Sequence, residues 1–142
     1  MIKSNTKFPG LVRVFVYGTL KPGEANYQKY CAGQVTDVKR AVTLGKLFAL
    51  PMGYPAMTPG GDSVHGYLLS FADLGILDAL DDLEDYQPAR QMSANLYYRQ
   101  QVEISDLQEL SLGKAWAYFM SLERVSQLKG VALLDGCWSN GD

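Results

Sequence analysis

Cysteine, histidine and long apolar runs are all scarce in this sequence, and each shortage excludes a class of protein. The chain has two cysteines, Cys31 and Cys137, and one histidine, His65. Two cysteines without metal-like spacing are too few for a disulfide scaffold or a zinc site, so a reduced, cytoplasmic protein is the default expectation. No segment approaches the roughly 18 apolar residues of a membrane-spanning helix. The lysine-containing start is not followed by the apolar stretch of a signal peptide.

A surplus of charge of either sign is also lacking. The 142 residues carry a net charge of −2, and the longest basic run is the pair Lys39–Arg40. This pattern does not indicate a nucleic acid or an anionic membrane as a partner. Because 47% of the residues are hydrophobic and 20% are charged, the composition is that of an ordinary globular protein. Without a repeat, a low-complexity tract or a charged linker, we expect one domain over residues 1–142.

Hydrophobic periodicity predicts several strands and few helices. Strands are expected at 11–17, 64–71, 97–104 and 114–120, with one or two more within 35–50. Helices are expected at 26–32 and at 73–86, the second with Asp73 as its N-cap, and the segment after residue 121 fits a short helix or a loop. The breaker-rich stretch 51–62 is predicted to be a loop. Because strands and helices do not alternate, an α+β fold on a mixed sheet is favoured over a doubly wound one.

One acidic residue of the helix expected at 73–86 falls on its apolar face. At about 100° per residue, Glu84 lies roughly 20° from Leu77 and 40° from Leu80. Those two leucines belong to a stripe that also contains Leu74, Ile76 and Leu83. The other acidic residues lie elsewhere: Asp81 near the border of the stripe, and Asp78, Asp82 and Asp85 away from it.

A carboxyl group buried on such a stripe has a chemical use. Desolvation would raise the pKa of Glu84 and make it a better base near neutral pH. Two structural alternatives stay open. The helix could end before Glu84 and leave its side chain in water, or Glu84 could form an ion pair with Arg99 or another basic residue.

The segment VFVYGTLKPG at residues 14–23 joins an apolar strand to a turn of small residues. Successive backbone N–H groups at such a turn bind anionic groups such as carboxylates. Gly18 would let a ligand approach the backbone closely, and the Thr19 hydroxyl could add a donor. The segment matches neither a P-loop nor a dinucleotide-binding GxGxxG fingerprint. A plain strand-to-turn junction stays open as the alternative.

Seven segments, taken in their order and spacing, carry a family resemblance. They are VFVYGTLKPGEAN at 14–26, GYPAM at 53–57, HGYLLSF at 65–71, LDALDDLEDY at 77–86, YYRQQVEI at 97–104, AWAYF at 115–119 and the closing DGCW. With them the sequence resembles the gamma-glutamylcyclotransferase-like family, in particular its small single-domain branch that includes gamma-glutamylamine cyclotransferases. The resemblance implies an α+β fold, a small mixed β-barrel with surrounding helices. The sequence departs from the family pattern at Asp85, where glycine is common, and at Cys137 in the closing motif.

The resemblance also implies an activity and a site. The expected reaction converts a small-molecule γ-glutamyl compound to 5-oxoproline and a free amine or amino acid, with no metal or cofactor. Glu84 would be the acid/base, and Tyr17, Gly18, Thr19 and Leu20 would form the substrate loop. Tyr54 and Tyr118 are expected as pocket walls with phenols available as donors, and core packing is the alternative for both. The leaving group and the oligomeric state stay open.

Two other classes of function remain as alternatives. The first is a non-catalytic binding or interaction domain that retains the family pocket, and an intact Glu84 argues against it because a pure binder needs no buried base. The second is a cysteine enzyme that acts through Cys31 or Cys137, for which the single histidine is a distant partner.

Overall fold

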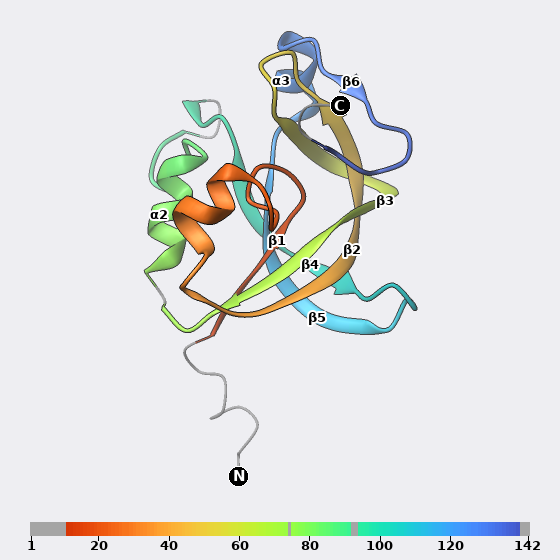
Figure 1. Cartoon of the computed structure of the whole chain (residues 1–142). Helices are drawn as coiled ribbons and strands as arrows, with labels where there is room; N and C mark the ends of the chain where they lie inside the picture. Colours follow the sequence, from red (N-terminus) through yellow and green to blue (C-terminus); the bar gives the residue numbers. More distant parts are fainter. Residues whose placement is uncertain (1–10, 74, 92–93, 140–142) are drawn as a thin grey trace.

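The computed structural model describes residues 11–73, 75–91 and 94–139. The elements follow one another as β1 (Val12–Val16), the π-helix η1 (Tyr27–Cys31), β2 (Val35–Ala49), β3 (Pro55–Phe71), α2 (Ile76–Leu83), β4 (Tyr98–Ser105), β5 (Ser111–Phe119), α3 (Leu122–Gln127) and β6 (Val131–Ala132). Strands form the body of the molecule, and α2 (green) and η1 (orange) lie side by side on one flank (Figure 1). The predicted α+β class is therefore confirmed.

The strands form a ring within a six-stranded sheet. Their order is β3-β1-β5-β4-β2-β6. A further pairing between β3 and β2 closes the first five of these strands into a ring, and β6 lies outside it, beside β2. The β1–β5 pairing is parallel and the others are antiparallel, so the sheet is mixed as predicted. Two of the strand pairings in the ring consist of a single residue pair each: Val14 with Trp116 between β1 and β5, and Val42 with Ser105 between β2 and β4.

Strand β1 separates two parts of the core. Its even-numbered residues, Val14 and Val16 among them, pack with Leu80 of α2 and Cys31 of η1 in one buried cluster. Its odd-numbered residue Phe15 packs in a second cluster with residues of the other strands of the ring. Since successive side chains of a strand point to opposite faces, a nearly continuous apolar run is required at this position, as the sequence pattern predicted.

The prediction of a loop over 51–62 is wrong for most of its length. Residues 51–54 form a turn, but β3 begins at Pro55 and pairs with β2 along nearly its whole length. The register shifts between Gly45 and Lys46, which lie opposite Asp62 and Thr58 respectively, so the Pro-Gly-Gly at 59–61 lies in a β-bulge. Proline is tolerated at the first residue of a strand and glycine at a bulge. Pro55 at the start of β3 and the Pro-Gly-Gly at the bulge are therefore compatible with one continuous strand.

Helix α2 is shorter at both ends than the predicted range 73–86. Its N-cap is Gly75 rather than Asp73, whose carboxylate instead accepts a hydrogen bond from the Gly75 N–H at 2.8 Å. Glu84 is the C-cap, and the backbone then turns at Asp85, which has a φ of 54°. Ile76 and Leu80 are buried, as the apolar stripe predicted. Leu74, another predicted member of the stripe, lies outside the described residues.

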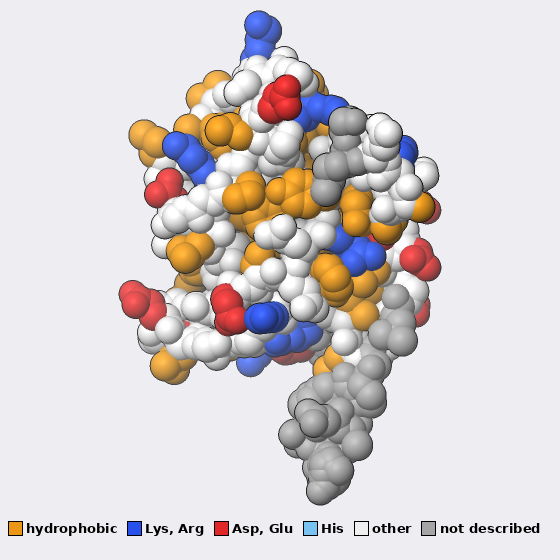
Figure 2. Space-filling model, turned by 180° about the vertical axis from the view of Figure 1, so that it is seen from behind, with side chains coloured by type: hydrophobic (Ala, Val, Ile, Leu, Met, Phe, Trp, Pro, Cys, Tyr) orange, Lys and Arg blue, Asp and Glu red, His pale blue; other side chains and the backbone are white. Residues whose placement is uncertain are grey.

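The remaining predictions of secondary structure hold within a few residues. The helix expected at 26–32 is the π-helix η1, which is followed by Gly33 at a φ of 87°. The segment after residue 121 contains α3, whose N-cap Ser121 accepts a hydrogen bond from the Arg124 N–H. None of the helices in the described ranges is long and apolar enough to cross a membrane. Acidic and basic side chains are interspersed on the face shown in Figure 2.

Candidate active site

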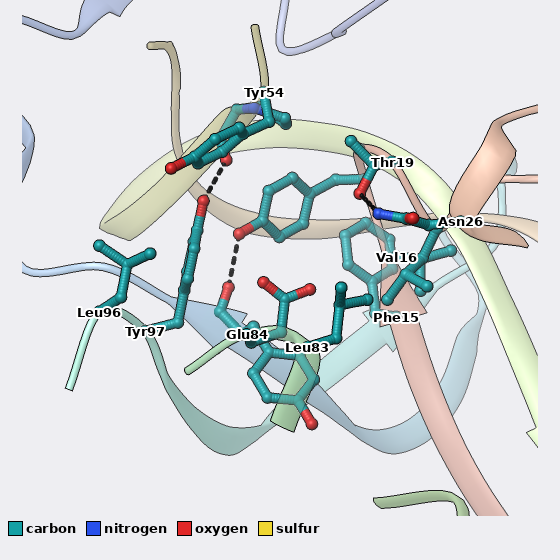
Figure 3. A pocket seen from close by; sticks show the side chains of 14 residues that line it. Phe15, Val16, Thr19, Asn26, Tyr54, Leu83, Glu84, Leu96 and Tyr97 are labelled. Atoms are coloured by element: carbon teal, nitrogen blue, oxygen red, sulfur yellow. Dashed lines mark hydrogen bonds between the residues drawn. The ribbon is translucent and has the colours of Figure 1, made fainter. Parts of the chain in front are cut away.

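The end of β1 and the loop after it line a pocket of about 290 Å³ together with residues from four other parts of the chain. The pocket contains all seven residues predicted for the site: Tyr17, Gly18, Thr19, Leu20, Tyr54, Glu84 and Tyr118. Seven further residues line it that the sequence did not single out: Phe15, Val16, Asn26, Pro55, Leu83, Leu96 and Tyr97. Figure 3 shows the Glu84 carboxylate between Thr19 and Asn26 on one side and Tyr54, Leu96 and Tyr97 on the other.

The loop after β1 is fixed by short-range contacts. The Lys21 N–H donates to the Gly18 carbonyl at 2.9 Å and closes a turn. The Asn26 side-chain amide donates to the Thr19 hydroxyl oxygen at 2.9 Å, and the Lys21 amine donates to the Trp138 carbonyl. Among the described residues, no hydrogen bond occupies the backbone N–H groups of Thr19 and Leu20. The loop therefore has donors available for an anionic group.

Gly18 allows this loop to pass close to the start of β3. A Cβ atom at position 18 would lie 2.4 Å from Cγ and 2.8 Å from Cδ of Pro55. Real Cβ atoms essentially never come closer than 3.0 Å to such a neighbour. Any side chain at this position would push the loop and Pro55 apart, so the wall of the pocket depends on a glycine here.

Glu84 reaches the pocket although α2 ends just before it. Its backbone N–H still donates to the Leu80 carbonyl at 2.9 Å, which fixes the residue at the helix end. The first structural alternative is thus correct for the backbone but not for the side chain, which points into the pocket rather than into open solvent (Figure 3). Burial raises the pKa of Glu84 to about 7. The residue keeps some exposure because it lines an open pocket.

Arg99 is the partner of a different carboxylate. Its Nε lies 2.8 Å from Oδ1 of Asp81, its other contact to that carboxylate is 3.1 Å long, and the Tyr118 hydroxyl donates to the same Oδ1 at 2.6 Å. The alternative of a Glu84–Arg99 ion pair is therefore wrong. Asp81 is buried, with 6% of its surface exposed, and not merely near the border of the stripe. In the described part of the chain, the Glu84 carboxylate has no hydrogen bond or ion pair.

Buried tyrosines surround Glu84. The Tyr17 hydroxyl donates to the Tyr118 carbonyl at 2.7 Å, and the Tyr97 hydroxyl donates to the Pro55 carbonyl at 2.7 Å. Burial, reinforced by the nearby Glu84, raises the pKa of Tyr17, Tyr97 and Tyr118 well above that of a free phenol. These phenols stay neutral near pH 7, whereas Glu84, with a pKa of about 7, can gain or lose a proton there. Tyr118 was expected to offer its phenol to a ligand, but its hydroxyl is bonded to Asp81.

Asp85, the departure from the family pattern beside Glu84, is exposed and does not line the pocket. Its φ of 54° lies in the left-handed region that favours glycine and that aspartate tolerates. Its exposed carboxylate pairs with Arg90 at 3.1 Å, and the same guanidinium group donates to the Asp85 carbonyl at 2.8 Å. The backbone geometry at this position is therefore kept without glycine, and the added charge is neutralised at the surface.

The two cysteines lie away from the pocket. Cys31 is buried in η1, where desolvation raises the pKa of its thiol to about 11. Cys137 is exposed, and neither cysteine lines the pocket that contains Glu84. A thiol with a raised pKa is a poor nucleophile near neutral pH, so the geometry gives no support to a cysteine enzyme acting through Cys31.

Comparisons of the sequence with known proteins identify its relatives. The family model described as "Gamma-glutamyl cyclotransferase, AIG2-like" matches residues 14–140. A protein of Vibrio cholerae described as "Putative gamma-glutamylcyclotransferase" is 32% identical over an alignment of 114 residues, with 74% of this chain and 78% of that protein covered.

Solved structures with the same fold come from a mammal and a bacterium. An AIG2-like protein of Mus musculus aligns with a TM-score of 0.66 at 23% identity, covering 91% of this chain and 88% of the other. YkqA of Bacillus subtilis aligns with a TM-score of 0.62 at 23% identity over 90% of this chain. The present chain spans 39% of YkqA, which is thus a much longer protein. At such identities the likeness is one of fold.

Proposed function

Because this chain belongs to the gamma-glutamyl cyclotransferase, AIG2-like family, we propose that it converts a γ-glutamyl compound to 5-oxoproline and a free amine or amino acid. Glu84 is the proposed acid/base, and the loop from Tyr17 to Leu20 is the proposed substrate loop. The observation that carries the proposal is an unpaired carboxyl group with a pKa of about 7, directed into a pocket beside a loop with free donors.

The proposed reaction is an internal rearrangement of the substrate followed by loss of one fragment. The substrate's α-amine attacks its own γ-carbonyl carbon, so that one C–N bond forms and closes a five-membered lactam. The C–N bond to the leaving nitrogen then breaks. No water enters and no enzyme group is acylated, because nucleophile and electrophile belong to the same molecule. Holding the substrate in a folded conformation is therefore a large part of catalysis, since oriented intramolecular attack can reach effective molarities of roughly 10⁵–10⁸ M.

Glu84 would carry the proton between the two nitrogens. As a carboxylate it accepts a proton from the α-ammonium, which makes the amine nucleophilic, and as a carboxylic acid it then gives that proton to the leaving nitrogen, which departs as a neutral amine. The ring nitrogen loses its second proton to water as the lactam forms, and the released amine takes up one proton from water. A pKa of about 7 suits both steps, because neither form of the group is strongly disfavoured at neutral pH. General acid–base catalysis of this kind contributes roughly 10²–10⁴ in rate.

The loop would hold the α-carboxylate end of the substrate. The backbone N–H groups of Thr19 and Leu20 are free among the described residues, and they lie on the wall of the pocket that contains Glu84. A carboxylate bound there would place the α-amine, one carbon away, near the base. The described lining residues include no lysine, arginine or histidine. We therefore expect leaving groups without a carboxylate, as in γ-glutamylamines, to be preferred over γ-glutamyl amino acids.

The proposal is tested with a panel of γ-glutamyl compounds. The purified protein is incubated with γ-glutamylamines, γ-glutamyl amino acids and a γ-glutamyl-lysine isopeptide, and 5-oxoproline is detected by mass spectrometry. We expect 5-oxoproline from at least one member of the panel. We expect none from a parallel incubation of that compound with the Glu84→Gln variant. Binding of these compounds without product would instead favour a non-catalytic binding domain.

A further inference from the structure

Tyr97 offers the pocket an acceptor and no donor. Its side chain is 4% exposed, and its one hydroxyl hydrogen is donated to the Pro55 carbonyl at 2.7 Å. A phenol whose hydrogen is committed can only accept further hydrogen bonds. The hydroxyl lies on the side of Glu84 where Tyr54 and Leu96 form the wall (Figure 3). This end of the pocket therefore suits a ligand group that carries an N–H.

The opposite end of the pocket has the reverse polarity. The Asn26 side-chain amide donates to the Thr19 hydroxyl oxygen at 2.9 Å (Figure 3). No described group accepts the Thr19 hydroxyl hydrogen, which is therefore available to a ligand, as are the free backbone N–H groups of the loop. Glu84 lies between this donor end and the acceptor end at Tyr97.

A folded γ-glutamyl substrate has the same polarity along its length. Its α-carboxylate needs donors, its α-ammonium lies next to that carboxylate, and its amide nitrogen carries an N–H beyond the γ-carbonyl. We propose that Tyr97 is a positioning residue whose phenolic oxygen accepts a hydrogen bond from the leaving nitrogen of the substrate. This inference rests on the proposed function and assigns the leaving-group end of the pocket to Tyr97, Tyr54 and Leu96.

Such a contact would orient the nitrogen that must be protonated. When its N–H donates a hydrogen bond to Tyr97, the leaving nitrogen is oriented so that a second proton can reach it from the side of Glu84. Tyr97 itself transfers no proton, because its hydrogen stays on the bond to Pro55. The contact exists for amides, whose leaving atom carries a hydrogen, and not for γ-esters, whose leaving atom is an oxygen without one.

The difference between amides and esters provides the test. The Tyr97→Phe variant keeps the ring and removes the acceptor. We expect its kcat/KM for a γ-glutamyl methylamide to fall by about tenfold, while that for glutamate γ-methyl ester is unchanged or raised. The Tyr67→Phe variant, on β3 and outside the described lining of the pocket, is the matched control and should change neither value. An equal fall for both substrates would mean that Tyr97 only supports Pro55, and would overturn the inference.

A binding measurement on the unaltered protein covers the case in which Tyr97→Phe does not fold. The probes are the mono-N-methylamide and the monomethyl ester of glutaric acid, which keep one carboxylate and lack the amine needed for reaction. The amide should bind at least about fivefold more tightly than the ester, and equal affinities would overturn the inference. If the γ-glutamyl panel yields product while these comparisons fail, the proposed function stands and the role of Tyr97 does not. If the panel yields no product, both are overturned.

Discussion

Two carboxylates at the end of α2 lie three residues apart and have opposite surroundings. Asp81 is buried with charge and hydrogen-bond partners: Arg99 at 2.8 Å and the Tyr118 hydroxyl at 2.6 Å. Glu84 is directed into the pocket, has no such partner in the described part of the chain, and has a pKa raised by burial to about 7. The presence or absence of a partner, more than the depth of burial, therefore distinguishes the structural carboxylate from the one that we propose for proton transfer.

The surroundings of Asp81 explain why its carboxylate serves the fold and is not available to a ligand. The Arg99 guanidinium lies 4.5 Å from the centre of the Trp116 ring and 5.6 Å from that of Tyr86, so it packs against two aromatic rings while it pairs with Asp81. The same carboxylate fixes the Tyr118 hydroxyl away from the ligand. This network ties α2 to β4 and β5 and fixes Tyr118, which lines the pocket together with Glu84.

The largest effect on stability is expected from breaking the Asp81 network. Replacing Asp81 with alanine leaves the Arg99 guanidinium, whose side chain is 16% exposed, without its carboxylate. Removing one partner of a buried pair costs about 3–5 kcal/mol. We expect the Asp81→Ala variant to lose that much free energy of unfolding in urea titrations. The exposed Asp82→Ala is the matched control, with a change within about 0.5 kcal/mol. A loss below about 1 kcal/mol for Asp81→Ala would contradict the structural role.

The largest effect on activity is expected from Glu84. The Glu84→Gln variant keeps the shape of the side chain and removes the group that carries the proton. Its kcat should fall by at least roughly a hundredfold, while circular dichroism shows an unchanged fold. The measurement is 5-oxoproline release from the best substrate of the panel. Near wild-type turnover would rule out Glu84 as the acid/base.

The same substitution should stabilise the protein at high pH. The pKa of Glu84 is raised from an ordinary 4.5 to about 7 in the folded chain, so the folded state binds more protons between these values. Stability from this group is therefore present in full below pH 4.5 and is lost as the pH rises to about 7. Above pH 7, Glu84→Gln should be more stable than wild type by on the order of 2–3 kcal/mol. Thermal unfolding at several pH values measures the difference, and a gap that does not close toward pH 4.5 would speak against a buried carboxyl.

Most of the fold could be predicted from local patterns, and the main failure has a clear cause. The apolar run of β1 and the leucine spacing of α2 reflect burial that is encoded in neighbouring residues. The start of β3 was missed because Pro55 and the Pro-Gly-Gly at 59–61 look like a loop when considered alone. Their strand geometry depends on pairing with β2 around a bulge, which no local pattern contains.

The site could be predicted in part for similar reasons. Glu84 was singled out by its angle on the helical wheel, and the loop after β1 by its glycine and by the family resemblance. Tyr97 was predicted only as the first residue of a strand, because the role of its hydroxyl depends on the Pro55 carbonyl, 42 residues away in sequence. The pairing of Arg99 with Asp81 instead of Glu84 could not be predicted, because a wheel gives directions around one helix and not the position of Arg99 on β4.

The central claim is that Glu84 takes up and releases the substrate's protons with a pKa of about 7. The most direct test is the pH dependence of kcat/KM for the best substrate of the panel between pH 5 and 9. Because the base must be deprotonated to act, kcat/KM should fall about tenfold per pH unit below an inflection near 7. An acid limb centred near 4.5, or no acid limb at all, would contradict the account.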